Sequence, residues 1–409
     1  MRYEDYVNLS YKPEKDDLIC NFYLEADNLL RASGAVAAES SIGTWTEVGT
    51  EKTYMKNLAA KVFEIKKLSK RSALIKIAYP IELFEPGNMP NILSSIAGNI
   101  FGMKEIRWLK LNEIVFPEKL VKSFKGPKYG IEGIRKIVKV KDRPLIGTIV
   151  KPKLGLNSKD HAETAYKAWI GGCDIVKDDE NLASQSFNKF EERLRLTFKM
   201  KEKAEKETGE KKIYMINVTA ETNEMLKRAK LVEDYGNEYV MVDIITTGWS
   251  ALQTLRNCNF NLVLHAHRAG HAAIDRNPKH GISMKVIARL TRIIGLDQLH
   301  IGTIVGKMYE KKEDVLENRK VLIEEFYGLK KVMPVASGGL NPLHVPFLYK
   351  TFGKDVVLQF GGGIHGHPSG TFEGAKAVRQ ALDAVLQGIS LKEYAKKHPE
   401  LKKAIEIWG

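Results

Sequence analysis

Cysteine is scarce in this sequence: 409 residues contain only three, Cys20, Cys173 and Cys258, and these lie far apart. They form neither a Cys-x-x-Cys pair nor an even set, which excludes a disulfide framework and favours a reducing compartment. No run of about 18 consecutive apolar residues occurs, which argues against a transmembrane helix. The first residues are polar and lack the apolar segment of a signal peptide. We therefore expect a soluble, cytoplasmic protein with no membrane partner.

Charge of one sign is in moderate excess, with 64 Lys and Arg against 50 Asp and Glu, a net charge of +14. The 44% of hydrophobic residues can form a large core, so the composition excludes intrinsic disorder. The excess suits either a nucleic-acid surface or a lysine-rich surface with a site for small anions. The densest run, residues 199–212, alternates in sign, which is typical of an exposed helix. We expect no nucleic-acid partner.

Residues 1–125 mix strand-like and helical segments irregularly, which predicts a smaller N-terminal α+β domain. Strands are expected at 53–65 and 72–79, and a helix at 89–101. The glycines and prolines of residues 117–135 predict a linker to a second domain, 126–409.

From residue 144 onward, short apolar runs alternate with amphipathic stretches, a pattern typical of a buried parallel sheet with helices between its strands. Eight such units favour a C-terminal (β/α)8 TIM barrel, an α/β fold ending in a helix. A dinucleotide-binding fold is excluded, because Lys151-Pro152-Lys153 follows the first run instead of a glycine-rich turn. The expected strands are 145–150, 173–176, 213–218, 239–244, 262–265, 299–303, 332–336 and 356–360. The expected helices include 161–170, 220–235, 283–294, 314–326 and 374–386.

Barrels of this type carry their active sites at the carboxyl ends of the strands. Polar loops end many strands, but charged residues or glycines at most of the eight ends together favour a functional site. These ends hold Lys151 and Lys153, the run 177–180, Asn217, Asp243, the run 265–268, His300 with Lys307, the run 337–339 and the run 361–363.

The run Lys177-Asp178-Asp179-Glu180 ends the second expected strand. Strand periodicity directs Lys177 and Asp179 to one side, and Glu180 can turn inward just beyond the strand. Carboxylate oxygens suit Mg²⁺, and a buried lysine could join them as a carbamate formed from CO2. A plain Lys–Asp ion pair beside a solvated Glu is an equally open interpretation.

Two glycine clusters, 337–339 and 361–363, follow the seventh and eighth runs, where these barrels often bind phosphate. Glycine lets backbone N–H groups approach phosphate oxygens closely. Arg268 and His300 could hold a second phosphate from other strand ends. The pattern favours a substrate with a phosphate at each end, although each cluster alone could be an ordinary turn.

Several strings together resemble the large subunit of ribulose-1,5-bisphosphate carboxylase/oxygenase (RuBisCO) over essentially the whole chain. In the barrel region they are GTIVKPKLGL (147–156), GGCDIVKDDEN (171–181), HAHRAGHA (265–272), HIGTIVGK (300–307), SGG (337–339) and QFGGG (359–363). In the N-terminal region they are AAESSIGTWTEV (37–48) and AGNIFGMK (97–104). The residues of these motifs are most similar to those of the archaeal form III type.

This resemblance implies a Mg²⁺ site made by carbamylated Lys177, with activating CO2 as the carbamate, together with Asp179 and Glu180. It implies that Lys151 is the base and acid at the enediol carbons and that His267 assists proton transfer. Lys307 would steady the carboxylate formed from CO2.

The resemblance further implies a set of residues that bind the bisphosphate. Those from the barrel are Lys153, Arg268, His300, Ser337, Gly338, Gly339, Gln359, Gly361 and Gly362. Those from the N-terminal domain of a partner subunit, which would complete the neighbouring site, are Glu39 (also catalytic), Thr44, Trp45 and Asn99. The implied assembly is a homodimer or a set of dimers, and no small subunit is expected.

The sequence departs from the family pattern at a few places. Ile149 stands where Thr is frequent, Ile301 where Ser is frequent and Gly270 where Met is frequent. The stretch MYEKKED after Lys307 lacks the usual Glu-Gly pair. None of these changes removes a catalytic group, and all bear on loop closure, CO2/O2 discrimination and turnover.

The implied activity is carboxylation, or oxygenation by O2, of ribulose 1,5-bisphosphate with cleavage to two 3-phosphoglycerate, by analogy in archaeal AMP and nucleotide degradation. The alternative is a RuBisCO-like enolase or isomerase that acts on a phosphorylated ketone without fixing CO2. The presence of Glu39, Asn99, Lys151 and Lys307 favours the carboxylase.

Overall fold

The computed structural model describes residues 1–306 and 309–409, which form two compact units. The first unit comprises Met1–Gly126, Gly270–Gly295 and Phe326–Leu329. The second comprises Pro127–Ala269, Leu296–Glu325 and Lys330–Gly409. No helix in these ranges is both long enough and apolar enough to cross a membrane.

The first unit is built on a five-stranded sheet in the order β10-β4-β1-β3-β2. Along β1 (Leu18–Glu25), buried and half-buried residues alternate, because successive side chains of a strand point to opposite faces. Helix α1 (Leu29–Glu39) packs against this sheet, and the Asn28 side chain caps it by accepting from the Arg31 N–H. The other strands are β2 (Lys61–Lys67), β3 (Ser72–Tyr79), β4 (Trp108–Val115) and β10 (Gly281–Ile282). The helices are η1 (Tyr3–Tyr6), η2 (Thr53–Leu58), η3 (Ile81–Leu83), α2 (Met89–Ile96), η4 (Asn99–Gly102), α3 (Glu118–Val121), α10 (Ala272–Asp275) and α11 (Met284–Ile294).

Three sequence predictions in this region need correction. The strand expected at 53–65 starts only at Lys61, because residues 53–58 form a 3-10 helix. The helix expected at 89–101 ends at Ile96, since Gly98 turns the backbone so sharply that an added Cβ would lie 2.1 Å from the Ser94 carbonyl oxygen. The expected linker 117–135 contains α3 and the start of α4 (Gly130–Val138).

The second unit is a closed parallel barrel of eight strands in the order β11-β12-β13-β5-β6-β7-β8-β9, which confirms the predicted TIM barrel. All eight strands match the expected apolar runs to within a few residues. They are β5 (Leu145–Ile149), β6 (Ile175–Lys177), β7 (Ile213–Asn217), β8 (Tyr239–Asp243), β9 (Val263–His267), β11 (Gln298–Gly302), β12 (Met333–Ser337) and β13 (Val357–Phe360).

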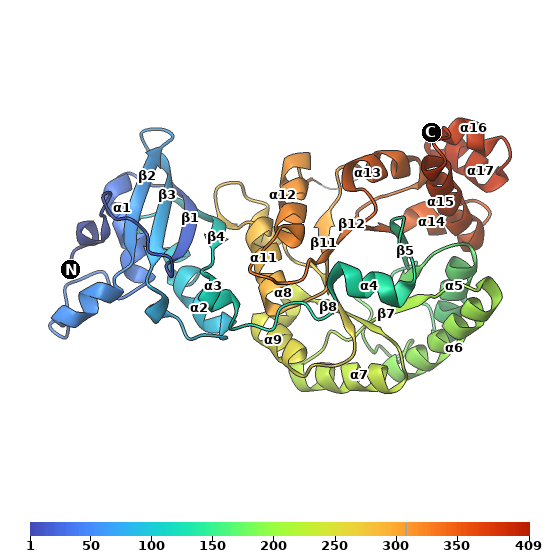
Figure 1. The fold of residues 1–409 in the computed structure, drawn as a ribbon, viewed down its shortest axis with the longest axis horizontal. Helices are drawn as coiled ribbons and strands as arrows, with labels where there is room; N and C mark the ends of the chain where they lie inside the picture. Colours follow the sequence, from blue (N-terminus) through green and yellow to red (C-terminus); the bar gives the residue numbers. More distant parts are fainter. Residues whose placement is uncertain (307–308) are drawn as a thin grey trace. The chain divides into compact units, whose positions relative to one another are not determined.

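Helices surround these strands in the ribbon (Figure 1). They are α5 (Ser158–Ile170), α6 (Phe190–Thr208), α7 (Thr222–Asp234), α8 (Ile244–Thr247), α9 (Trp249–Asn257), α12 (Lys312–Ile323), η5 (Pro342–His344), α13 (Val345–Phe352), α14 (Gly362–His365), α15 (Thr371–Leu386), α16 (Leu391–Ala395) and α17 (Pro399–Trp408).

The amino end of the barrel is closed by an apolar cluster. Ile131, Ile134 and Val138 of α4 lie in one buried group with the first residues of the strands, such as Leu145 and Ile213. This apolar face explains why α4 is a helix of the barrel instead of a linker. The opposite end, where the strands finish, is thereby left for polar groups.

The alternating charge run of α6 is less exposed than predicted. The Lys201 side chain is buried, and its Nζ lies 3.5 Å from Glu205 and 3.6 Å from Glu238. Lys212, just after the helix, is also buried, and its Nζ donates to Glu210 at 2.7 Å and to the Cys173 carbonyl at 3.1 Å. The prediction of an exposed helix holds for most of the run but was wrong for these two lysines, which pack against neighbouring carboxylates and the Cys173 carbonyl.

Candidate active site

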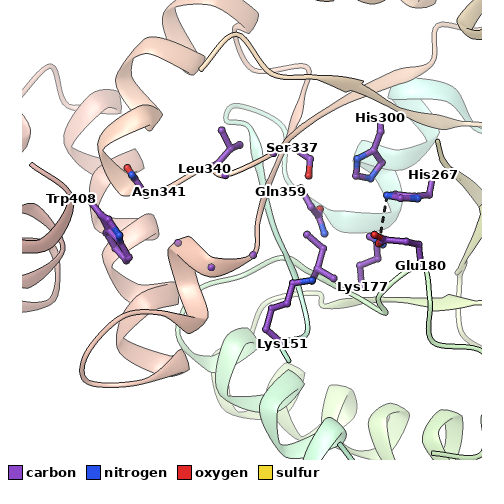
Figure 2. Close-up of a pocket in the computed structure, with 16 residues that line it drawn as sticks. Lys151, Lys177, Glu180, His267, His300, Ser337, Leu340, Asn341, Gln359 and Trp408 are labelled. Carbon is purple, nitrogen blue, oxygen red and sulfur yellow. Dashed lines mark ion pairs between the residues drawn. The ribbon is translucent and has the colours of Figure 1, made fainter. Parts of the chain in front are cut away.

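A cavity of about 460 Å³ opens where the barrel strands end. Figure 2 shows Lys177, Glu180 and His267 gathered at one side and Trp408 and Asn341 at the other. The lining residues come from strand ends far apart in sequence, and they are Ile149, Lys151, Lys177, Glu180, His267, His300, Ser337, Gly338, Gly339, Leu340, Asn341, Gln359, Gly361, Gly362, Gly363 and Trp408. The prediction that these strand ends meet at one mouth is confirmed.

Lys177 is the last residue of β6, and its side chain is fully buried. Its Nζ donates to the Asp178 carbonyl at 2.7 Å and lies 3.7 Å from a Glu180 carboxylate oxygen. Burial lowers the pKa of Lys177, and the nearby carboxylates of Glu180 and Asp179 offset only part of that shift. The amine is therefore more easily neutral than that of a surface lysine.

The two carboxylates after Lys177 have different partners. Asp179 accepts a hydrogen bond from Lys151 Nζ at 2.7 Å. Glu180 lies 3.6 Å from His267 Nε2, the contact drawn as a dashed line in Figure 2, which is an ion pair only when His267 is protonated. Burial raises the pKa of Glu180, but the charge of Lys177, and that of His267 whenever its ring is protonated, outweigh it and lower this pKa to about 2. Both carboxylates can therefore act as oxygen ligands.

Asp178 points away from this group and is fully buried. Its carboxylate accepts from Arg193 Nε at 3.0 Å, from the Tyr214 hydroxyl at 2.8 Å and from the Asn217 N–H at 3.0 Å, and His161 lies 3.1 Å away. Burial alone would raise the pKa of Asp178, but Arg193 and His161 hold it well below its usual range. This network fixes the backbone between Lys177 and Asp179.

Three histidines from β9 and β11 lie together. His267 Nδ1 is 2.8 Å from Asp243 Oδ1, and because a carboxylate only accepts, Nδ1 carries the proton and Nε2 faces Glu180. Behind it, His300 Nε2 lies 3.0 Å from His265 Nε2, and His265 Nδ1 lies 2.9 Å from Gln298. Burial, then Lys177, lowers the pKa of His267, so the ring is favoured in its neutral form.

The opposite wall consists mainly of backbone. Gly338 and Gly339 follow Ser337, the last residue of β12, and Gly361 to Gly363 follow β13 and begin α14. A Cβ added at Gly363 would lie 2.0 Å from the Leu340 carbonyl oxygen, whereas at Gly362 it would meet nothing within 4 Å. Gly363 thus permits close packing of the wall, and Gly362 leaves open space.

Some predicted site residues do not line this cavity. Lys153 is exposed, with its Nζ 3.4 Å from Asn181 Oδ1, and Arg268 is buried against Glu310. Glu39, at the end of α1, Thr44 and Trp45, in the following loop, and Asn99, at the start of η4, all belong to the first unit. Lys307 lies outside the described residues.

The lining residues that the sequence reasoning did not assign to the site include Leu340, Asn341 and Trp408. The first two directly follow the predicted glycine cluster 337–339, which was the available signal. Trp408 lies at the end of α17, far from any strand end in sequence, and no local pattern indicates it. Asn217 and Asp243, noted only as strand ends, prove to hold the Glu180 backbone and the His267 ring.

The side chains at the pocket can bind a hard divalent ion if Lys177 carries a carbamate. Within residues 1–306 and 309–409, no three His, Cys, Asp or Glu side chains gather as a ready-made metal site. Glu180 lines the cavity and Asp179 is buried just behind it, and both carboxylates act on the buried amine of Lys177. A carbamate on that amine would complete an all-oxygen set of the kind that Mg²⁺ prefers.

Comparison with known proteins identifies the family of this chain. The family "Ribulose bisphosphate carboxylase large chain, catalytic domain" matches residues 130–408, and its N-terminal domain matches residues 5–120. The chain belongs to this family. The relatives named ribulose bisphosphate carboxylase include one from Methanosarcina mazei, 52% identical over 99% of both chains, and one from Pyrococcus furiosus, 49% identical over 100% of this chain and 98% of the other.

Solved RuBisCO structures share the fold. The octameric RuBisCO from Pyrococcus horikoshii OT3, in complex with sulfate ion, superposes with a TM-score of 0.96 at 46% identity, covering 99% of this chain and 96% of the other. The dimeric archaeal RuBisCO from Hyperthermus butylicus superposes with a TM-score of 0.94 at 45% identity, covering 100% and 99%. The resemblance inferred from the sequence motifs is confirmed.

Proposed function

We propose that this chain is a ribulose-1,5-bisphosphate carboxylase that enolises its substrate, adds CO2 or O2 and, after CO2 addition, cleaves the product to two 3-phosphoglycerate. The observation that carries the proposal is the convergence of Lys151, Lys177, Glu180, His267 and His300 on one cavity whose far wall is glycine backbone. Membership of the carboxylase family and the names of its relatives support it.

The proposed metal ligands are Asp179, Glu180 and Lys177 as its carbamate. When bound there, Mg²⁺ would supply Lewis-acid chemistry to the substrate oxygens. The buried, easily neutralised amine of Lys177 supports carbamate formation, because only the neutral amine reacts with CO2.

The proton-transfer roles follow from the side chains that face the cavity. Lys151 would take the C3 proton, for which its Nζ must leave the Asp179 carboxylate that it now contacts at 2.7 Å. His267, neutral and oriented by Asp243, would move a proton at Nε2. Lys307 would steady the new carboxylate, a role assigned by family resemblance.

The substrate would be held by a phosphate at each end. The N–H groups around Gly338, Gly339, Gly361 and Gly362 suit one phosphate, with Ser337 and Gln359 beside them. Both polar atoms of the Gln359 side chain are buried without a hydrogen-bond partner in the part of the chain that the structure describes, which suits a role in binding a ligand. Arg268, His300 and Lys153 would bind the remaining groups.

We further propose that each site needs two chains. Glu39, Thr44, Trp45 and Asn99 would complete the site of a partner subunit in a homodimer or an assembly of dimers. Trp45 supports this, because it is 79% exposed and so leaves a large apolar surface that a partner subunit can cover. A cytoplasmic role in archaeal-type AMP and nucleotide degradation is part of the same proposal.

The deciding experiment incubates the protein with ribulose 1,5-bisphosphate, Mg²⁺ and labelled bicarbonate and measures labelled 3-phosphoglycerate. Label in that product supports the carboxylase. Proton exchange at C3 without labelled product would indicate the RuBisCO-like enolase instead.

Mixing inactive Glu39→Ala with inactive Lys177→Ala should restore activity, because one site of each mixed dimer then carries neither change. A mixture that stays inactive after verified exchange would contradict the shared site.

A further inference from the structure

Arg268, proposed to bind a phosphate, is already paired with a carboxylate in this structure. Its Nη2 donates to Glu310 Oε1, and each of the two side chains is only 5% exposed. Glu310 belongs to the stretch MYEKKED, in which this sequence departs from the usual Glu-Gly pair of the family.

The pair occupies a defined place in the barrel. It lies over Gly302, the last residue of β11, whose φ is +89°. A Cβ added at Gly302 would come within 2.9 Å of Arg268 Nη2 and 3.0 Å of Glu310 Oε1. The two groups therefore meet in close contact with the backbone, unlike a solvent-exposed ion pair.

The guanidinium still has donor capacity for an anion. Arg268 Nη1 is buried and has no hydrogen-bond partner among residues 1–306 and 309–409. A guanidinium fork binds carboxylates and phosphates through the same parallel N–H groups. A phosphate that used both Nη atoms would have to take the place of the Glu310 carboxylate, because two anions cannot share one fork without strong repulsion.

We propose that Glu310 competes with a substrate phosphate for the guanidinium of Arg268 and so lowers the affinity of this phosphate subsite. The competition has a second consequence: without substrate, the carboxylate neutralises a buried arginine that would otherwise be costly to keep charged. The identity of the phosphate rests on the proposed function, but the competition itself does not.

The expected change in phosphate affinity depends on the fraction of molecules in which Arg268 is not paired with Glu310. A ligand that binds only the unpaired form loses affinity in proportion to that fraction. If the pair is formed in most molecules, removing its charge should tighten phosphate binding by about three- to thirtyfold.

The test measures binding of inorganic phosphate by calorimetry, without turnover, to the full-length protein and to Glu310→Gln. We expect tighter binding in Glu310→Gln and no change in Glu313→Gln, which removes the same charge from an exposed position in the first turn of α12. In an Arg268→Ala background, Glu310→Gln should have no effect on phosphate affinity. Glu310→Asp, with a shorter carboxylate, should lie between the wild type and Glu310→Gln.

Each other outcome overturns the proposal. Unchanged binding in Glu310→Gln would show that the carboxylate does not compete, and weaker binding would show that it orients Arg268 for phosphate instead. If Glu313→Gln tightens phosphate binding equally, or if Glu310→Gln still tightens it in an Arg268→Ala background, the effect comes only from the overall negative charge of this loop. If Glu310→Gln is unstable, Glu310→Asp with the phosphate-induced rise in Tm gives the same decision. Absence of labelled 3-phosphoglycerate would refute the proposed function but leave this result intact.

Discussion

The two walls of the pocket are built in opposite ways. One wall consists of charged and polar side chains, Glu180 and His267 around the fully buried Lys177, that the ends of β6 and β9 bring together. The other consists of backbone, the glycine runs after β12 and β13. The side-chain wall depends on which groups are present, whereas the backbone wall depends on which side chains are absent.

This difference predicts opposite weaknesses. Deleting a side chain should disable the first wall, because each group has its own role and its own partner. Adding a side chain should disable the second wall, because its N–H groups are useful only while nothing covers them.

The largest expected effect is on the side-chain wall. Lys177→Ala should lower carboxylation by at least about a thousandfold, since the change removes a group that the metal site and the site electrostatics both need. Labelled-bicarbonate assays measure the loss, and Lys159→Ala, an exposed lysine of α5, is the matched control. A Lys177→Ala protein with a tenth of normal activity would refute the assigned role.

The Asp178 network behind this wall should contribute to the free energy of unfolding. Asp178→Asn leaves the buried Arg193 without its charged partner, and loss of one member of a buried pair costs about 3–5 kcal/mol. Denaturant unfolding should show this loss, whereas the exposed Asp142→Asn should stay near wild type. An equally stable Asp178→Asn would mean that the Asp178 network does not hold the wall.

The backbone wall can be tested with two neighbouring glycines. Gly363→Ala places a Cβ against the Leu340 carbonyl and should cost about 1–3 kcal/mol or more of stability. Gly362→Ala has open space and should fold normally, yet weaken phosphate binding by about tenfold, or 1.4 kcal/mol, because its methyl group covers the N–H groups. Thermal unfolding and phosphate calorimetry on both variants measure these effects, and the reverse pattern would contradict the description of this wall.

The smallest effect concerns pH. Activation by CO2 with Mg²⁺ should become faster as pH rises, because a lysine loses its proton above its pKa and only the neutral amine reacts. Burial lowers the pKa of Lys177 from 10.5, so the rate should level off below pH 10.5. Initial activation rates across this range measure the effect. A rate that still climbs at pH 10.5 would contradict the lowered pKa.

The barrel was predictable because its signal is local and repeated. Eight apolar runs, each long enough for a fully buried strand, alternate with amphipathic helices, and eight such units fit a closed barrel better than an open doubly wound sheet. The N-terminal unit was less predictable. Residues 53–58 contain strand-forming side chains but form a 3-10 helix, and α4 was mistaken for a linker because its glycines concealed the apolar face of Ile131, Ile134 and Val138.

Much of the candidate site could also be found from the sequence, since strand ends and glycine clusters mark the mouth of a barrel. The structure brings Lys151, Lys177, His267 and His300 to one cavity as those ends predict. Trp408 and the pairing of Arg268 with Glu310 could not be found this way, because each depends on residues from segments distant in sequence.

The sequence by itself determined the barrel, the order of its strands and the identity of the groups at their ends, because periodicity and composition act over a few residues at a time. Only the tertiary structure decided which of those groups became buried and what each contacts. Lys177 is easily neutralised, Asp178 faces Arg193, and Arg268 is engaged by Glu310, because close packing excludes water and turns a neighbour from another strand or loop into a partner.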